Sequence, residues 1–145
     1  LLARPVIAQE AFLMCTQMWC DEGLRVTFEL PKWPTGEYKI EMLADDKAVW
    51  CTAILPFKDC ETVGFVCDSP DVQVATEGCA LPKEQHKLGG IWMQIPPAKI
   101  MLTLTRPDGK KSSLDTAVES ECSWPNGEQC DERECCSAQY TLSVK

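Results

Sequence analysis

The sequence is poor in histidine, in basic residues and in long apolar runs. It has 14 lysines and arginines against 22 acidic residues, and its formal net charge is −8. Nucleic acids and anionic membranes bind clustered basic side chains, whereas here Lys110 and Lys111 form the only adjacent basic pair. No apolar run approaches the roughly 20 residues of a transmembrane helix. We therefore expect no nucleic-acid partner and no transmembrane segment.

The cysteine and histidine spacings that are typical of metal sites are also missing. The close cysteine spacings contain no C-x-x-C pair, and His86 is the single histidine, so a structural zinc site is not indicated. The even number of cysteines and their density are instead typical of disulfides formed in an oxidising compartment. We predict no metal and no cofactor, and we predict that all ten cysteines form disulfides: Cys15, Cys20, Cys51, Cys60, Cys67, Cys79, Cys122, Cys130, Cys135 and Cys136.

Motifs for catalysis are lacking as well. His86 lies between Gln85 and Lys87 in a polar stretch, and no G-x-S-x-G nucleophile motif accompanies it. We expect an exposed histidine without a catalytic role, and a protein that is not an enzyme. The acidic clusters near Asp45, Asp68 and Asp131 do not match a calcium-binding loop, so we expect solvated turns there.

What the sequence does contain is strand alternation. At residues 24–30, Leu24, Val26 and Phe28 share one face and polar residues share the other, as in a half-buried strand. Similar strands are predicted at 37–43, 49–55, 91–96, 99–105 and 112–120, and shorter ones at 62–67, 71–76 and 139–144. Residues 80–88 could form one or two helical turns. The fold class is therefore all-β: a disulfide-stapled β-sandwich, immunoglobulin-like or similar.

One arrangement occurs twice. Residues 24–55 and 91–120 each read as a strand, a proline-containing loop, a strand, an aspartate turn and a strand. We expect two three-stranded units that face each other across one core.

Two adjacent cysteines precede the last strand. Neighbouring residues in a strand point to opposite faces, so Cys135 and Cys136 are predicted to form bridges in two directions, one on the core side and one to a covering loop. Elsewhere spacing favours the local bridges Cys15–Cys20 and Cys60–Cys67, and Cys51 is expected to reach a distant partner. Spacing alone does not determine the full connectivity.

Two tryptophans, Trp33 and Trp124, each precede a proline in a loop. If exposed, their rings could stack on sugars, which makes them the candidate ligand-binding residues. If buried, they would cap the open ends of the sandwich core.

The N-terminal stretch stands apart from the strands. Residues 1–14 are expected to form an extension and residues 15–145 the domain, with an export signal already removed. Residues 1–12 could pack on their own domain or add a strand to a partner or to a second copy. FLMC at residues 12–15 is similar to a lipoprotein cleavage box, but Met14 is large where a small residue is required. We therefore expect Cys15 to form a disulfide and not to carry a lipid anchor.

Several longer stretches carry a resemblance: WCDEGLRVTFE at 19–29, WPTGEYKIEMLADDKAVWCTAILP at 33–56, GCALPKEQHKLGGIWMQIPPAKIMLTLTRPDG at 78–109 and PNGEQC at 125–130. Over residues 15–145 the chain resembles a family of small exported, lipoprotein-like, disulfide-rich domains of myxobacteria and related bacteria. GCALP through His86 and PNGEQC are its most specific parts. The resemblance implies export and a disulfide-bonded β domain, without an assigned activity.

A second resemblance is local. LPKWPTGEYKIE at residues 30–41 is similar to the late strand pair of lipid-recognition domains of the GM2-activator type. From all of this we expect a secreted or cell-surface, non-enzymatic domain with a structural or protein-interaction role in an extracellular assembly. The alternative is a glycan- or lipid-binding module that uses Trp33 and Trp124.

Overall fold

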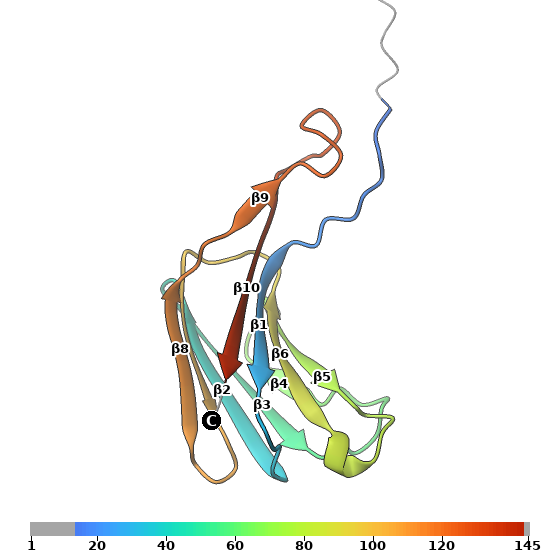
Figure 1. Ribbon diagram of the computed structural model, residues 1–145. Coiled ribbons are helices and arrows are strands. Elements are labelled where there is room, and N and C mark those ends of the chain that lie inside the picture. Colours follow the sequence, from blue (N-terminus) through green and yellow to red (C-terminus); the bar gives the residue numbers. More distant parts are fainter. Residues whose placement is uncertain (1–13, 144–145) are drawn as a thin grey trace, which may run out of the picture.

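The chain folds into two packed β-sheets. A computed structural model describes residues 14–143, and within them the strands are β1 (Gly23–Glu29), β2 (Gly36–Ala44), β3 (Lys47–Leu55), β4 (Phe65–Cys67), β5 (Val72–Glu77), β6 (Lys87–Met93), β7 (Lys99–Thr105), β8 (Lys111–Ala117), β9 (Glu121–Ser123) and β10 (Cys135–Ser143). Sheet A has the order β5-β6-β1-β10-β9, and sheet B has the order β4-β3-β2-β7-β8 (Figure 1). The prediction of an all-β sandwich is confirmed.

In the described part of the chain, helical structure is confined to one short turn. A 3-10 turn spans Lys83–Gln85, inside the stretch where one or two helical turns were expected. Among residues 14–143, no helix is long and apolar enough to cross a bilayer. Residues 1–12, the predicted partner-binding segment, lie outside the described part of the chain.

Strand alternation produces the core. In β2, Tyr38, Ile40 and Met42 are buried while the residues between them are exposed, because side chains of successive strand residues point to opposite faces of a sheet. β1 and β7 repeat the pattern and supply Leu24, Leu102 and further buried side chains to the same cluster. The buried faces of the two sheets therefore pack on each other as one core.

The two repeated units are interleaved. The first strand of each unit lies in sheet A, where β1 pairs antiparallel with β6. The other two strands lie in sheet B, where β2 pairs antiparallel with β7, and β3 and β8 flank this pair. The sequence suggested that the two units face each other as separate layers, but each unit contributes strands to both sheets. The first and second strands of each unit lie beside their counterparts, and the third strands lie on opposite sides of the β2–β7 pair, which gives the sandwich an approximate internal two-fold arrangement.

The C-terminal strand β10 pairs parallel to β1, in a register that matches Gly23 with Ser137 and Glu29 with Ser143. On the other side of β1, the backbone of β6 approaches closely at Gly90. This glycine has a φ of 144°, and an added Cβ would overlap the carbonyl oxygen of Val26. The close approach therefore requires glycine.

The described chain contains five disulfides and no free cysteine. They are Cys15–Cys130, Cys20–Cys135, Cys51–Cys67, Cys60–Cys79 and Cys122–Cys136. Such a set is typical of proteins from oxidising compartments.

The adjacent cysteines behave as predicted, with one difference in their partners. Cys135 is buried and bridges to Cys20 in the N-terminal segment, whereas Cys136 points the other way and bridges to Cys122. Cys122 belongs to β9, which pairs with β10 in register at these two residues, so that partner is a strand and not a loop.

The local bridges inferred from spacing are wrong. Cys15 and Cys20 each reach across to the β9–β10 region, because the N-terminal segment runs alongside that region (Figure 1). Cys67 lies in β4 directly opposite Cys51 in β3, so these two residues form the bridge. Cys60 pairs with Cys79 instead, and the expectation of a distant partner for Cys51 is also wrong, since its partner is in the neighbouring strand.

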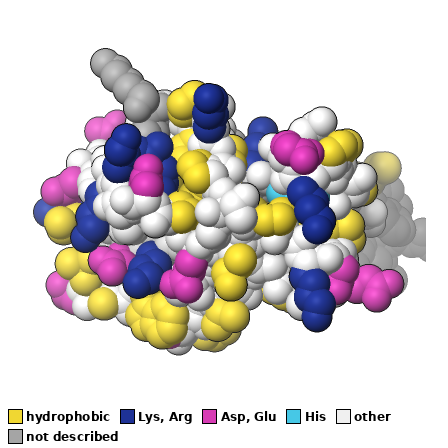
Figure 2. Space-filling model, turned by 90° about the horizontal axis from the view of Figure 1, so that it is seen from below, with side chains coloured by type: hydrophobic (Ala, Val, Ile, Leu, Met, Phe, Trp, Pro, Cys, Tyr) yellow, Lys and Arg dark blue, Asp and Glu magenta, His cyan; other side chains and the backbone are white. Residues whose placement is uncertain are grey.

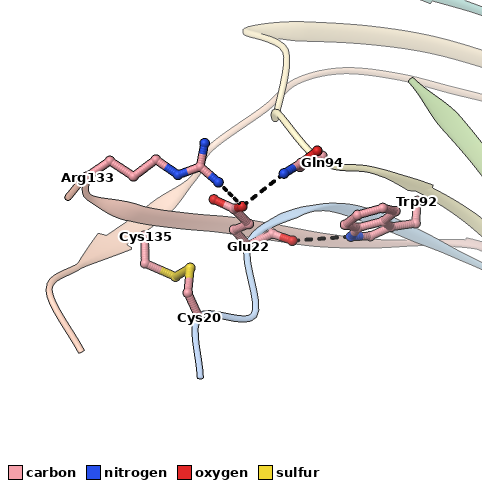
Figure 3. Close-up of polar contacts among 6 residues, drawn as sticks. All are labelled: Cys20, Glu22, Trp92, Gln94, Arg133 and Cys135. Carbon is pink, nitrogen blue, oxygen red and sulfur yellow. Dashed lines mark hydrogen bonds and ion pairs between the residues drawn. A yellow bond between two sulfur atoms is a disulfide. The ribbon is translucent and has the colours of Figure 1, made fainter. Parts of the chain in front are cut away.

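Polar contacts reinforce the covalent attachment of the N-terminal segment (Figure 3). The Glu22 carboxylate accepts hydrogen bonds from Arg133 and, at 3.3 Å, from the Gln94 amide. The indole N–H of Trp92 donates to the Glu22 carbonyl oxygen at 3.2 Å. Together with the neighbouring Cys20–Cys135 bridge, these contacts fix the entry of the chain into β1.

Candidate functional site

Trp33 lies in the β1–β2 loop and packs against the core. Its ring centroid is 5.4 Å from that of Tyr38, which is fully buried and donates a hydrogen bond from its hydroxyl to the Pro34 carbonyl. Burial raises the pKa of Tyr38 to about 12, and the Arg106 charge partly offsets this rise. Partial burial on Tyr38 favours the capping role for Trp33 over an open sugar-binding platform.

Trp124 does not join Trp33. It lies in the β9–β10 loop, at the upper end of the sandwich in Figure 1, whereas the β1–β2 loop lies at the lower end. Trp124 is partly buried, beside the turn that Asn126 ties to Met18 and Asp131. The two candidate ligand-binding tryptophans therefore cannot contact one small ligand together.

His86 is buried, with 5% of its surface exposed, so the expectation of an exposed histidine is wrong. The Phe57 backbone N–H donates to its Nδ1 at 3.0 Å, which places the ring proton on Nε2, 3.0 Å from the Leu81 carbonyl oxygen. The ring also stacks on the Phe57 side chain. Its polar sequence neighbours are exposed, but alternation with buried Leu88 points His86 inward. Both ring nitrogens are thus occupied by the backbone.

We expect His86→Ala to lower the free energy of unfolding by about 2–4 kcal/mol, because it leaves the buried Phe57 N–H and the part-buried Leu81 carbonyl without their partner and opens a cavity. His86→Gln should lose less, since an amide can both accept and donate. Urea denaturation of both variants measures this difference. Gln85→Ala, at the exposed neighbouring position, is the control and should stay within about 0.5 kcal/mol of the wild type. Equal stability of all three variants would contradict the structural role of His86.

The acidic clusters lie in turns and bind backbone or basic groups. Asp45 has a φ of 52° and accepts hydrogen bonds from the N–H groups of Ala98 and Lys99, both at 3.0 Å. Asp71 pairs with Lys47 at 2.6 Å, and this hydrogen bond and charge hold the pKa of the Asp71 carboxyl below its usual range. These carboxylates therefore stabilise turns and connections.

One group of potential metal ligands lies within 4.8 Å in the described chain: Cys122, Glu134 and Cys136. Its two sulfur atoms are bonded to each other as a disulfide. Metal coordination by cysteine requires thiolates, so this group does not fit a metal ion.

The outer face of sheet B carries an exposed apolar cluster, which we call the Trp50 patch: Leu43, Ala48, Trp50 and Met101. Leu43 lies directly opposite Ala48 on β3 and opposite Met101 on β7. Trp50 is two residues along β3 on the same face, with half of its surface exposed. The patch lines a shallow groove of about 440 Å³. Apolar side chains are therefore contiguous over three strands.

A second apolar hollow continues along β3. Ile54 points to the same face as Trp50, and with Val63 and Val66 it lines a groove of about 280 Å³, which we call the Ile54 groove. Thr52 lies between the two on β3, opposite Val66. Figure 2 views the molecule from below, so its lower border corresponds to the rear of Figure 1, where sheet B lies. Hydrophobic side chains gather along this border.

Two carboxylates, Glu41 and Asp68, line the same groove as Trp50. Glu41 lies directly opposite Trp50 in the β2–β3 ladder. Asp68 accepts a hydrogen bond from the Trp50 N–H at 2.9 Å, and its own N–H donates to the Trp50 carbonyl at 3.1 Å. Neither carboxylate belongs to an ion pair among residues 14–143. The groove that contains the Trp50 side chain is therefore bordered by two carboxylates, one from β2 and one from the segment after β4.

The sequence interpretation missed this face, although a signal was present. In β3 both sets of alternating positions contain apolar residues, with Val49 and Cys51 inward and Trp50 and Ile54 outward. A strand with apolar residues on both faces is expected to be covered by other groups on both faces.

Comparisons of the chain with protein-family models, with curated proteins and with solved structures found no match.

Proposed function

We propose that this protein is an exported, non-enzymatic domain that binds a protein partner at the cell surface or in an extracellular assembly, through the Trp50 patch. The observation that carries the proposal is the contiguous apolar surface across β3, β2 and β7. Solvent-facing sheet positions are ordinarily polar, and exposed apolar clusters mark interaction sites. Aromatic residues and methionine are enriched at the centres of protein interfaces.

Other features agree with this role. The disulfides support export to an oxidising compartment. Both nitrogens of His86 are bound to backbone groups, which leaves the single histidine without a free position for acid–base chemistry. A glycan-binding role through Trp33 and Trp124 has less support, because Trp33 packs on the core and the loops that carry the two residues lie at opposite ends of the sandwich.

A photoreactive benzoylphenylalanine at Ala48, an exposed position at the edge of the Trp50 patch, tests the proposal in the cells that export the protein. We expect a discrete crosslinked protein, identified by mass spectrometry, whose yield falls strongly when Trp50→Ala is added. The control places the same residue at Gln73, an exposed position on β5 of sheet A. Equal crosslinking from both positions, or glycan-array binding that requires Trp50, would contradict a protein-binding function.

A further inference from the structure

We propose that the partner places a lysine or arginine side chain over the Trp50 ring, between Glu41 and Asp68, and packs apolar side chains on Leu43, Met101 and the Ile54 groove. This inference rests on the proposed function and specifies the chemistry of the partner. The argument has three steps, which concern the ring, the charges and the length of the apolar surface.

The first step concerns the ring. Half of the Trp50 surface is open to solvent, although its backbone is held in sheet B by pairing with β2 and by both hydrogen bonds to Asp68. Tryptophan is the aromatic side chain that attracts cations most strongly, and arginine is the most frequent partner. A cation over this ring would bind a side chain whose backbone is already fixed in position.

The second step concerns the charges. Of the residues that the structure describes, Glu41 and Asp68 are the charged ones that line the groove of the Trp50 patch. Lys39, Lys99 and Lys111 lie on the same face of sheet B, but none of them forms an ion pair with these carboxylates within residues 14–143. Lys47 is already paired with Asp71. An incoming cation would therefore gain two carboxylates, whereas an acidic partner would be repelled by them and by the net charge of −8.

The third step concerns length. Trp50 and Ile54 are four residues apart on one strand, and a strand rises about 3.3 Å per residue, so the two contact points are about 13 Å apart. A partner segment in an extended conformation would span this distance with four of its own residues. We therefore expect a basic residue and a large aliphatic residue at that spacing.

Panning a phage-displayed library of random linear dodecapeptides against the oxidised full chain tests this inference. Phage that still bind Trp50→Ala are removed first, so that the remaining peptides depend on Trp50. We expect lysine or arginine in these peptides, with a large aliphatic residue about four positions away. The affinity of the synthetic peptides should fall at least about tenfold in the double variant Glu41→Gln, Asp68→Asn, and should weaken with rising salt.

The matched control is the double variant Glu121→Gln, Glu128→Gln, which removes the same charge from the β9–β10 region and should change affinity less than about twofold. Equal losses in both double variants, or Trp50-dependent peptides without basic residues, would overturn the inference and leave the proposed function intact. If panning yields no Trp50-dependent peptide, the inference is also overturned. The crosslinking experiment at Ala48 then decides separately whether a protein partner binds.

Discussion

Removing both bridges of the N-terminal segment is expected to cost more stability than twice the cost of removing one. Cys15–Cys130 and Cys20–Cys135 both span a sequence separation of 115 residues. With either bridge intact, the other closes a ring of only about 12 residues in the unfolded chain, and chain entropy then gives it about 3 kcal/mol. When both bridges are absent, the long loop is no longer closed in the unfolded chain, and the free energy of unfolding falls by about 5 kcal/mol more.

Three alanine variants measure this effect: one without Cys15–Cys130, one without Cys20–Cys135, and one without either bridge. In urea denaturation we expect losses of about 3 kcal/mol for each single removal and about 8 kcal/mol for the double removal. The bridge Cys122–Cys136, with a separation of 14 residues, is the control and should cost about 3 kcal/mol when removed. Strictly additive losses would show that the two long bridges restrict the unfolded chain independently.

Gly90→Ala is expected to lower the free energy of unfolding by about 4 kcal/mol or more, or to prevent folding. The new Cβ would overlap the backbone carbonyl oxygen of Val26, so β1 and β6 would have to separate at the centre of sheet A. The φ of 144° adds strain for any residue with a side chain. Thermal and urea denaturation of the purified variant measure the loss.

Gly109→Ala is the matched control for this substitution. Gly109 also has a positive φ, 86°, but an added Cβ would meet no atom within 4 Å. We expect a loss of about 1 kcal/mol from backbone strain alone. If both variants lost the same stability, strain would account for the effect and the contact with Val26 would not matter.

Local patterns were sufficient to predict most strands and the fold class. The alternation in residues 37–43 corresponds to β2, and that in residues 99–105 corresponds to β7. β9 was missed because all three of its residues are exposed, which leaves no alternation to detect. Pairing of strands depends on distant parts of the chain, so the interleaving of the two repeated units could not be read from the sequence.

The same limit applies to individual residues. Cysteine spacing suggested local bridges, but the parallel pairing of β1 with β10 brings the N-terminal segment beside Cys130 and Cys135 instead. His86 has polar neighbours in sequence, which give no sign of its burial. The ring is buried where it binds the Phe57 backbone, which belongs to the β3–β4 loop and is distant in sequence. The Trp50 patch is different, because the two apolar faces of β3 were visible in the sequence itself.

The paired bridges of the N-terminal segment have a mechanical consequence. Suppose the polypeptide is pulled between a point before residue 14 and a point after residue 143. Tension that enters at Cys15 or Cys20 passes through sulfur atoms directly to Cys130 and Cys135, at or near the start of β10. It then runs along β10, a strand that is already extended. The intervening residues, which hold most of the core and the whole Trp50 patch, are bypassed by this covalent route and would carry none of the tension.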